Sequence, residues 1–321
     1  MAHIVYQDSQ FESLPDESVL DTLLRNNIHV SNSCRAGLCH ACLMRCVKGD
    51  VSAEAQKDLK PAQKEQNYFL ACQCKADQDL EVVLPDNEDI FISALLVDKQ
   101  QLSPSVWQFR LETAVPVFYH AGQFINLKKD ADCIRSYSLS SLPSTDDFLE
   151  IQVQILPDGE MSQWLLNDFN IGQHIDIEGP NGHCYYTNTP DSPLLLLGTG
   201  TGLAPVYGIA RDALHQGHQG EIHLYHGAAS ADELYLHKQL NALAAEHSNF
   251  HYYGCVHESD IEGIYPEHAP DLAMANHKSL KDWKVFLCGA PEMVQKYSKL
   301  AFLGGANMKD INSDPFTPAQ K

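Results

Sequence analysis

The pattern of apolar and polar positions divides the chain into three segments of different texture. In the first segment, alternating stretches at 4–6 and 80–84 predict short strands, and the apolar residues within 18–25 follow helical spacing. The polar run 85–89 breaks both periods and predicts a linker. A small α+β domain over residues 1–89 is therefore expected.

The second segment, residues 90–188, is rich in strand-like runs. These runs lie at 90–97, 106–111, 123–127 and 149–155. Several strands at short spacing predict an antiparallel β-barrel, interrupted by one helix over 161–167.

The third segment, residues 189–321, alternates strands with helices. Strands are expected at 194–197, 221–225, 250–256 and 285–288, and helices at 203–214, 232–245 and 291–303. This alternation predicts a parallel sheet with helices on both faces. The whole chain is thus expected to be a multidomain protein with an α+β, a β-barrel and an α/β domain.

Length and charge agree with this division and limit the partners. A chain of 321 residues, 44% of them hydrophobic, is too long for one ordinary core. The formal net charge of −20 disfavours binding to nucleic acid or to anionic membranes, and it favours protein partners with basic patches. The alternative is that the acidic surface only provides solubility.

The sequence carries no signal for secretion or for membrane insertion. The start at Met1 lacks a basic segment, an apolar core and a cleavage site, and no run approaches the roughly 18 apolar residues of a membrane span. We therefore expect a cytoplasmic protein with reduced thiols, and a monomer.

Four cysteines have the spacing C-x4-C-x2-C-x29-C. Cys34, Cys39, Cys42 and Cys72 match the plant-type pattern in which four thiolates hold a 2Fe-2S cluster. The small residues of this loop allow backbone N–H groups to approach the sulfur atoms. A zinc site and a disulfide framework are the alternatives. Cys74 competes with Cys72 as the fourth ligand, and we favour Cys72.

A glycine loop follows the apolar run 194–197. It consists of Gly198, Thr199, Gly200, Thr201 and Gly202, and it leads into the helix predicted to start at residue 203. Such a loop presents backbone N–H groups and a helix N-terminus to a pyrophosphate. Leu203 replaces the third glycine of the usual dinucleotide motif, and a simple tight turn is the alternative.

Several further motifs resemble those of the ferredoxin–NADP reductase superfamily. The run Arg135-Ser136-Tyr137-Ser138 resembles its flavin motif, and the stretches 198–205 and 287–293 resemble its pyridine-nucleotide motifs. With the cysteine motif at the N-terminal end, the order of the segments resembles the reductase components of bacterial multicomponent oxygenases. The resemblance covers essentially the whole chain.

This resemblance implies FAD as the flavin and assigns roles to individual residues. Arg135 neutralises the diphosphate, Tyr137 lies against the flavin, and the Ser138 hydroxyl donates to flavin N5. Gly159, Met161 and Ser162 correspond to the start of a short phosphate-binding helix. The usual second glycine and a basic residue are missing there, and Gln154 stands in place of the latter.

Two further residues are assigned to the place where the nicotinamide meets the flavin. Cys288 begins a Cys-Gly pair that lies beside the nicotinamide in the family, and a buried structural cysteine is the alternative. The ending 311–316 resembles the family ending in which an aromatic residue, here Phe316, lies over the flavin.

The nucleotide is expected to be NADH. No arginine follows Arg211, and the loop 226–233 contains Asp232 and Glu233, which would repel a 2′-phosphate. Lys238 is the residue that would instead favour NADPH.

The predicted function is electron transfer from NADH through FAD and the 2Fe-2S cluster to a terminal oxygenase or hydroxylase. Ser138 and Cys288 are the candidate catalytic residues. Alternatives are electron supply to a non-oxygenase, such as a deoxysugar dehydratase, and a redox-sensing binding protein. Histidine pairs that are close in sequence, such as His223 with His226, lack a ligand context.

Overall fold

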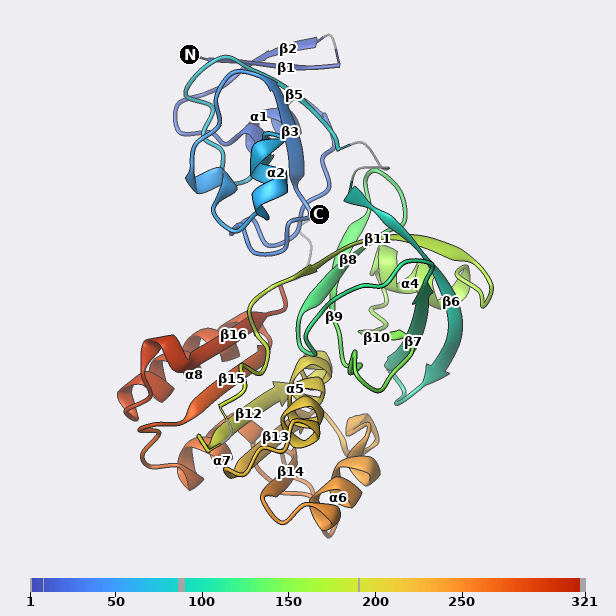
Figure 1. Cartoon of the computed structure of the whole chain (residues 1–321), viewed down its shortest axis with the longest axis vertical. Coiled ribbons are helices and arrows are strands. Elements are labelled where there is room, and N and C mark those ends of the chain that lie inside the picture. Colours follow the sequence, from blue (N-terminus) through green and yellow to red (C-terminus); the bar gives the residue numbers. More distant parts are fainter. Residues whose placement is uncertain (1, 8, 86–89, 190, 318–321) are drawn as a thin grey trace.

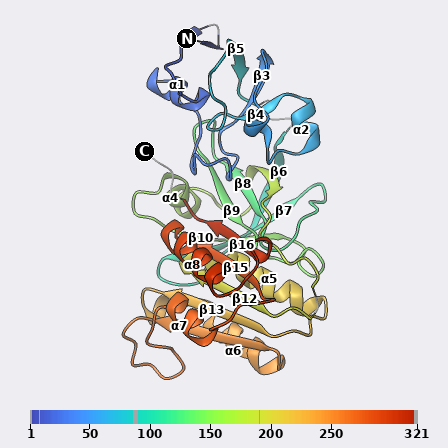
Figure 2. The same cartoon turned by 90° about the vertical axis from the view of Figure 1, so that its left-hand side faces the viewer.

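The computed structural model describes residues 2–7, 9–85, 90–189 and 191–317. Its described strands form three sheets, of five, six and five strands in chain order. In both views the N-terminal unit lies at one end of the molecule and the C-terminal unit at the other, with the six-stranded unit between them (Figures 1 and 2). The multidomain α+β, β-barrel and α/β architecture expected from the sequence is confirmed.

The N-terminal unit is a mixed sheet packed against short helices. Its sheet has the order β2-β1-β5-β3-β4, in which only β1 and β5 pair in parallel. The Ser18 side chain caps the first helix, and Asp21 completes the capping box. The elements are β1 (His3–Tyr6), β2 (Ser9–Glu12), α1 (Val19–Arg25), β3 (Leu43–Lys48), η1 (Glu54–Gln56), α2 (Pro61–Glu65), β4 (Tyr68–Leu70) and β5 (Leu80–Val83).

The central unit is an antiparallel barrel in the order β10-β7-β6-β11-β8-β9. A bridge between Leu139 and Ile151 joins its two outer strands, and Ser140 N–H donates to the Glu150 carbonyl at 2.9 Å beside it. The barrel is thereby closed. Its elements are β6 (Ile92–Gln101), β7 (Val106–Thr113), β8 (Phe124–Lys128), β9 (Ile134–Ser138), β10 (Leu149–Gln154), α4 (Glu160–Asn167) and β11 (His174–Asn181).

The C-terminal unit is a parallel sheet in the order β14-β13-β12-β15-β16, with a hydrophobic core on each face. Residues alternate between the two cores along β12: Leu194 and Leu196 pack towards α5, whereas Leu195 and Leu197 pack towards α7 and α8. The elements are β12 (Leu194–Thr199), η2 (Gly200–Gly202), α5 (Leu203–His215), β13 (Ile222–Ala228), η3 (Ala231–Glu233), α6 (His237–Glu246), β14 (Phe250–Val256), α7 (Ala269–Asn276), β15 (Lys284–Gly289), α8 (Pro291–Leu303), η4 (Met308–Asp310) and β16 (Ile311–Pro315).

The structure corrects one predicted helix. The helix expected over 232–245 is divided, because Leu236 adopts a left-handed conformation with φ 57° between η3 and α6. The sequence pattern also missed β2, β3, α2, β4, α7, β9, β11 and β16. Polar residues occupy much of β9, β11 and β16, so these strands lack the apolar alternation on which the prediction depended.

The parallel sheet presents its functional loops at one edge. The carboxyl ends of parallel strands lie together, so the glycine loop after β12 is next to the segments that follow β13 and β15. This edge faces the barrel: α5 places Gly208 against Ala121 and the Leu139 carbonyl. Among the described helices, none is long and apolar enough to cross a membrane.

Candidate functional site

Four cysteine thiols come together in the loop that precedes β3 and in the turn that follows β4. The Cys34 sulfur accepts hydrogen bonds from the backbone N–H groups of Ala36 and Cys39, both at 3.3 Å. Cys39 hydrogen-bonds to Cys34 through its thiol, and Cys42 does the same to Cys72. The fold therefore places Cys34, Cys39, Cys42 and Cys72 around one point.

The loop favours the thiolate at Cys34 and Cys72, whereas Cys39 and Cys42, whose thiols donate to them, have pKa values raised well above the usual one. Hydrogen bonds from the Cys39 thiol and then from backbone N–H groups lower the pKa of Cys34 to about 5. The Cys42 thiol and the Gln73 amide lower the pKa of Cys72 to about 7. Thiolates are the form that binds iron, and N–H groups directed at sulfur help to set a cluster's potential.

The three small residues of the loop act as the sequence suggested. Ala36 donates its N–H to Cys34, Gly37 donates to Cys72, and Ala41 donates to Cys39. Gly37 has a φ of +78°, and a Cβ at this position would lie 2.9 Å from Cγ of Gln73. Its glycine identity therefore allows the loop to close over the thiols.

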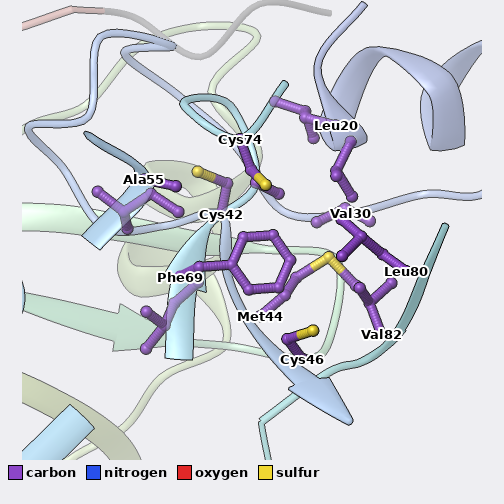
Figure 3. Close-up of a cluster of buried hydrophobic side chains, with 14 of the residues drawn as sticks. Leu20, Val30, Cys42, Met44, Cys46, Ala55, Phe69, Cys74, Leu80 and Val82 are labelled. Carbon is purple, nitrogen blue, oxygen red and sulfur yellow. The ribbon is translucent and has the colours of Figure 1, made fainter. Parts of the chain in front are cut away.

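Cys74 shares the hydrophobic core with Cys42, but the groups that act on its thiol are Ser52, Cys46 and Asp77 rather than any of the motif cysteines. Figure 3 shows Cys74 among Leu20, Ala55 and Phe69, and its exposed fraction is 1%. Burial raises the pKa of its thiol to about 12, which disfavours the thiolate. The geometry thus groups Cys72, and not Cys74, with the motif cysteines.

Strand β9 connects this thiol loop to the C-terminal unit. The Ser136 hydroxyl donates to Asn126 Oδ1 at 2.6 Å and lies 3.3 Å from the Cys39 carbonyl oxygen, and the Ser138 hydroxyl donates to the Asp314 carboxylate at 2.9 Å. Both residues lie on one face of the strand because side chains alternate. One strand of the barrel therefore contacts both neighbouring units within three residues.

Further hydrogen bonds strengthen these contacts between units. The backbone N–H of Ile134 donates to the Ser31 hydroxyl at 3.1 Å. The Ser33 hydroxyl donates to the carbonyl of Thr317, just beyond β16, at 3.0 Å. The thiol loop is thus held against both the start of β9 and the end of the C-terminal sheet.

Arg135 and Tyr137 occupy the opposite face of β9. The Arg135 guanidinium donates to the carbonyl of Ile134 at 2.8 Å, and no carboxylate pairs with it among the described residues. A planar cation with free donors suits a diphosphate. Tyr137 is partly buried against the barrel core and presents an aromatic surface beside it.

Asp314 is a site residue that the sequence analysis did not single out. It lies on β16 opposite Cys288 in the parallel register and is only partly exposed. Burial raises its pKa to about 6, although the hydrogen bond from Ser138 opposes that shift. A carboxyl group that titrates close to neutral pH is typical of functional sites.

The Cys288 thiol is fully buried. It packs in the core beneath α5 and lies 3.7 Å from the Cys184 sulfur. Burial raises its pKa well above the usual value. What Cys288 contributes to the surface of the site is its backbone, which borders the glycine loop at Gly202.

The start of α4 offers backbone rather than side chains to a ligand. Gly159 caps the helix, and a Cβ there would lie 2.4 Å from the Ser162 hydroxyl oxygen. Ser162 donates to the Gly159 carbonyl at 3.2 Å, and Met161 is buried in the barrel core. Direct ligand contacts from the side chains of Met161 and Ser162 are therefore not part of this arrangement.

Comparison with known proteins agrees with this geometry. Three family models match: a 2Fe-2S iron-sulfur cluster binding domain over residues 4–77, an oxidoreductase FAD-binding domain over 93–186 and an oxidoreductase NAD-binding domain over 196–299. The chain is 31% identical, over 94% of each chain, to the ferredoxin–NAD(P)+ reductase component of naphthalene 1,2-dioxygenase and salicylate 5-hydroxylase systems from Ralstonia. This protein belongs to the ferredoxin–NAD(P)+ reductase components.

Two other relatives have names that indicate different partner enzymes. The chain is 26% identical to a CDP-6-deoxy-L-threo-D-glycero-4-hexulose-3-dehydrase reductase from Yersinia pestis, over 97% of this chain and 96% of that one. The structure of an Amycolatopsis cytochrome P450 reductase superposes with a TM-score of 0.72 at 26% identity and full coverage of both chains. The reductase architecture thus spans the entire chain.

The residues present fit the three cofactors of this reductase family, which are a 2Fe-2S cluster, FAD and a nicotinamide nucleotide. Four converging thiols suit the cluster, the unpaired Arg135 suits a diphosphate, and the glycine loop at the start of α5 suits a pyrophosphate. When bound, FAD accepts a hydride and the cluster carries single electrons.

In this reductase the glycine loop leaves no room for a Cβ at Gly198 or at Gly202, and the clash is more severe at Gly202. A Cβ at Gly202 would lie 2.1 Å from the Cys288 carbonyl oxygen. We expect Gly202→Ala to displace the loop and to raise KM for NADH on the order of ten-fold in ferricyanide reduction. Gly217→Ala is the matched control, because it lies outside the nucleotide loop, no atom lies within 4 Å of its Cβ, and its φ of +78° costs only about 1 kcal/mol. Equal effects of the two substitutions would contradict this prediction.

Proposed function

We propose that this reductase takes electrons from NADH and delivers them through FAD and the 2Fe-2S cluster to a terminal oxygenase or hydroxylase. The observation that carries the proposal is the pair of contacts made by β9. Ser136 contacts the carbonyl of Cys39, in the thiol loop, and Ser138 donates to Asp314, at the nucleotide edge of the parallel sheet. A flavin held by this strand would lie between the nucleotide, as electron donor, and the cluster, as electron acceptor.

We assign each cofactor to the part of the chain that suits it. The proposed domains are 1–89 for the cluster, 90–188 for FAD and 189–321 for the nucleotide. Cys34, Cys39, Cys42 and Cys72 are the proposed cluster ligands.

The flavin and the nucleotide are assigned on the same basis. In this proposal FAD is bound by Arg135, Tyr137, Ser138, Phe316 and the backbone of Gly159, Met161 and Ser162, and the nucleotide is bound by residues 198–202. Phe316 follows β16, and its N–H donates to the Gly289 carbonyl at 2.8 Å, which supports its place at this junction. Ser138 is the proposed catalytic side chain, and Cys288 contributes through its backbone.

NADH is the proposed nucleotide because the loop after β13 is acidic. Asp232 is exposed there, and Glu233 accepts hydrogen bonds from the hydroxyls of Ser103 and Ser105 at 2.6 and 2.8 Å. The described residues of this loop include no arginine that would bind a 2′-phosphate. We infer that Lys238 does not determine the preference between NADH and NADPH, because it is exposed on α6 rather than in the loop.

We expect kcat/KM for NADH to exceed that for NADPH by at least about ten-fold, because a 2′-phosphate would meet like charge. Asp232→Arg is expected to lower this preference for NADH over NADPH. Glu246→Arg, at the far end of α6, should leave the preference unchanged. Initial rates of ferricyanide reduction with both nucleotides measure the ratio. A wild-type preference for NADPH would reject the assignment.

The electron acceptor is proposed to dock on the thiol loop. Leu38 exposes 51% of its surface between two of the proposed ligands, and apolar exposure next to a cluster suits a protein contact. The net charge of −20 favours a partner with a basic surface. We further propose a monomer in the cytoplasm.

Anaerobic titration with NADH tests the proposed path. Bleaching of the flavin spectrum accompanied by a rhombic S = 1/2 signal in low-temperature EPR is the expected result. If NADH leaves both centres oxidised while dithionite reduces them, the nucleotide assignment is wrong, and a sensor that binds without turnover becomes the better interpretation.

The dehydrase reductase from Yersinia favours one specific alternative acceptor. Assays that couple this protein to a purified aromatic-ring oxygenase and, separately, to a deoxysugar dehydratase distinguish the two. Product formation only in the dehydratase assay would replace the oxygenase in our proposal, without changing the path from NADH to the cluster.

A further inference from the structure

A histidine and carboxylate cluster lies on the C-terminal sheet, at the edge opposite the glycine loop. His223 and His251 are the second residues of β13 and β14 and face each other directly in the parallel register. Glu221 comes immediately before β13. One potential ligand atom from each of these three residues lies within 4.8 Å of the others. The sequence analysis did not pair these histidines, because they are 28 positions apart.

The Glu221 carboxylate lies between the two imidazoles. Its Oε2 atom is 2.6 Å from Nε2 of His251 and 3.9 Å from Nε2 of His223. In a tetrahedral zinc site with bonds of about 2.0–2.1 Å, ligand atoms are about 3.3 Å apart. The two observed distances bracket that value, so small rotations of these partly exposed side chains would bring three ligand atoms to binding distance.

The surroundings of His223 hold its ring in a suitable orientation. The Tyr253 hydroxyl lies 3.4 Å from His223 Nδ1, which leaves Nε2 directed at Glu221. Metal-binding histidines commonly use their second nitrogen in this way. The ring also packs against Trp283 and His277, with centroids 5.5 and 4.7 Å away.

His277 is not a member of the ligand set in this arrangement. Its Nε2 atom is engaged by the Tyr225 hydroxyl at 3.0 Å. Its ring packs edge-on against the His223 ring and so restricts how that ring can turn.

We propose that Glu221, His223 and His251 bind one divalent transition-metal ion, with Zn²⁺ as the best fit. Two neutral imidazoles and one carboxylate are a donor set that Zn²⁺ accepts, with water completing the coordination. Since β14 is the edge strand, the ion would join it to its neighbour β13. The expected consequence is a more stable C-terminal domain, with electron transfer unaffected.

Isothermal titration of the full-length, cofactor-loaded protein with ZnCl₂ tests this proposal, after treatment with a chelating resin. We expect one site with a dissociation constant in the micromolar range, weakened at least ten-fold in Glu221→Gln and in His251→Asn. His215→Asn, an exposed histidine at the end of α5, is the matched control and should bind like wild type. Thermal melting should show a zinc-dependent rise in Tm that both site variants lose.

Trp283 provides a local reporter for the same site. Titration with NiCl₂ should quench its fluorescence, and this quenching should be absent in Trp283→Phe and at least ten-fold weaker in His251→Asn. Glu221 and His251 are partly exposed, so their variants are expected to fold, and unchanged NADH:ferricyanide activity verifies this. Binding and quenching that are the same in wild type and His251→Asn would overturn the proposal and leave the His251 to Glu221 contact as an ordinary surface hydrogen bond.

Discussion

Cys72→Ser is expected to abolish the visible absorption bands and the EPR signal of the cluster while NADH still reduces the flavin. Cys72 is one of four converging thiols, and the Cys42 and Gln73 contacts lower its pKa to about 7. Serine is a far weaker iron ligand than a thiolate. Cytochrome c reduction should fall on the order of 100-fold or more, because single electrons no longer leave through the cluster.

Cys74→Ser provides the matched control, since it makes the same chemical change two residues away. Cys74 is buried in the core of the N-terminal unit beside Leu20 and Phe69 (Figure 3). We expect it to retain the cluster spectrum and to lose only about 1–2 kcal/mol of stability, because a hydroxyl replaces an apolar sulfur. Iron content and visible spectra of the two purified variants show which cysteine is the fourth cluster ligand. Loss of the cluster in Cys74→Ser, with retention in Cys72→Ser, would reassign the fourth ligand.

The sequence was informative where chemistry depends on local spacing. The loop 34–42 places three thiols by backbone geometry alone, and the glycines of 198–202 likewise act within one turn. The alternation of apolar runs revealed the three sheets for the same reason, because burial repeats along each strand or helix.

The sequence did not predict contacts between segments that are far apart along the chain. Asp314 meets Ser138 across 176 positions, and nothing in the polar run 311–316 distinguishes its carboxylate from the many exposed ones. His251 faces His223 only because β13 and β14 are adjacent in the sheet. For Cys288 the sequence left two interpretations open, a residue beside the nicotinamide and a buried structural cysteine. Strand β15 alternates its side chains and directs the Cys288 thiol into the core.

The contact between Ser138 and Asp314 leads to a pH-dependent rate of flavin reduction. A serine hydroxyl has one proton, and at neutral pH Ser138 donates it to the Asp314 carboxylate at 2.9 Å. In the proposed assignment this hydroxyl would then not be free to donate to flavin N5. Because burial raises the pKa of Asp314 to about 6, protonation below that pH turns the carboxyl group into a donor and releases the Ser138 hydroxyl.

We therefore expect the stopped-flow rate of flavin reduction by saturating NADH to rise as the pH falls through about 6. Asp314→Asn should abolish this pH dependence, since an amide does not titrate in this range. Ser138→Ala should be slow at every pH, on the order of 100-fold below wild type, whereas Ser138→Thr keeps the hydroxyl and should recover most of the rate. A pH profile that survives in Asp314→Asn would exclude this carboxyl group as its origin.

The same carboxyl group predicts a stability effect with a definite sign. The pKa of Asp314 is higher in the folded protein, about 6, than its ordinary value of 3.8. Its protonated form therefore stabilises the fold below about pH 4, and this contribution is lost as the pH rises through 6. Asp314→Asn should consequently have a higher Tm than wild type at pH 8 and a similar one at pH 4. A difference in Tm that is independent of pH would show that the Asp314 carboxyl group is not buried as a charge, and the proposed control of the Ser138 hydroxyl would fail with it.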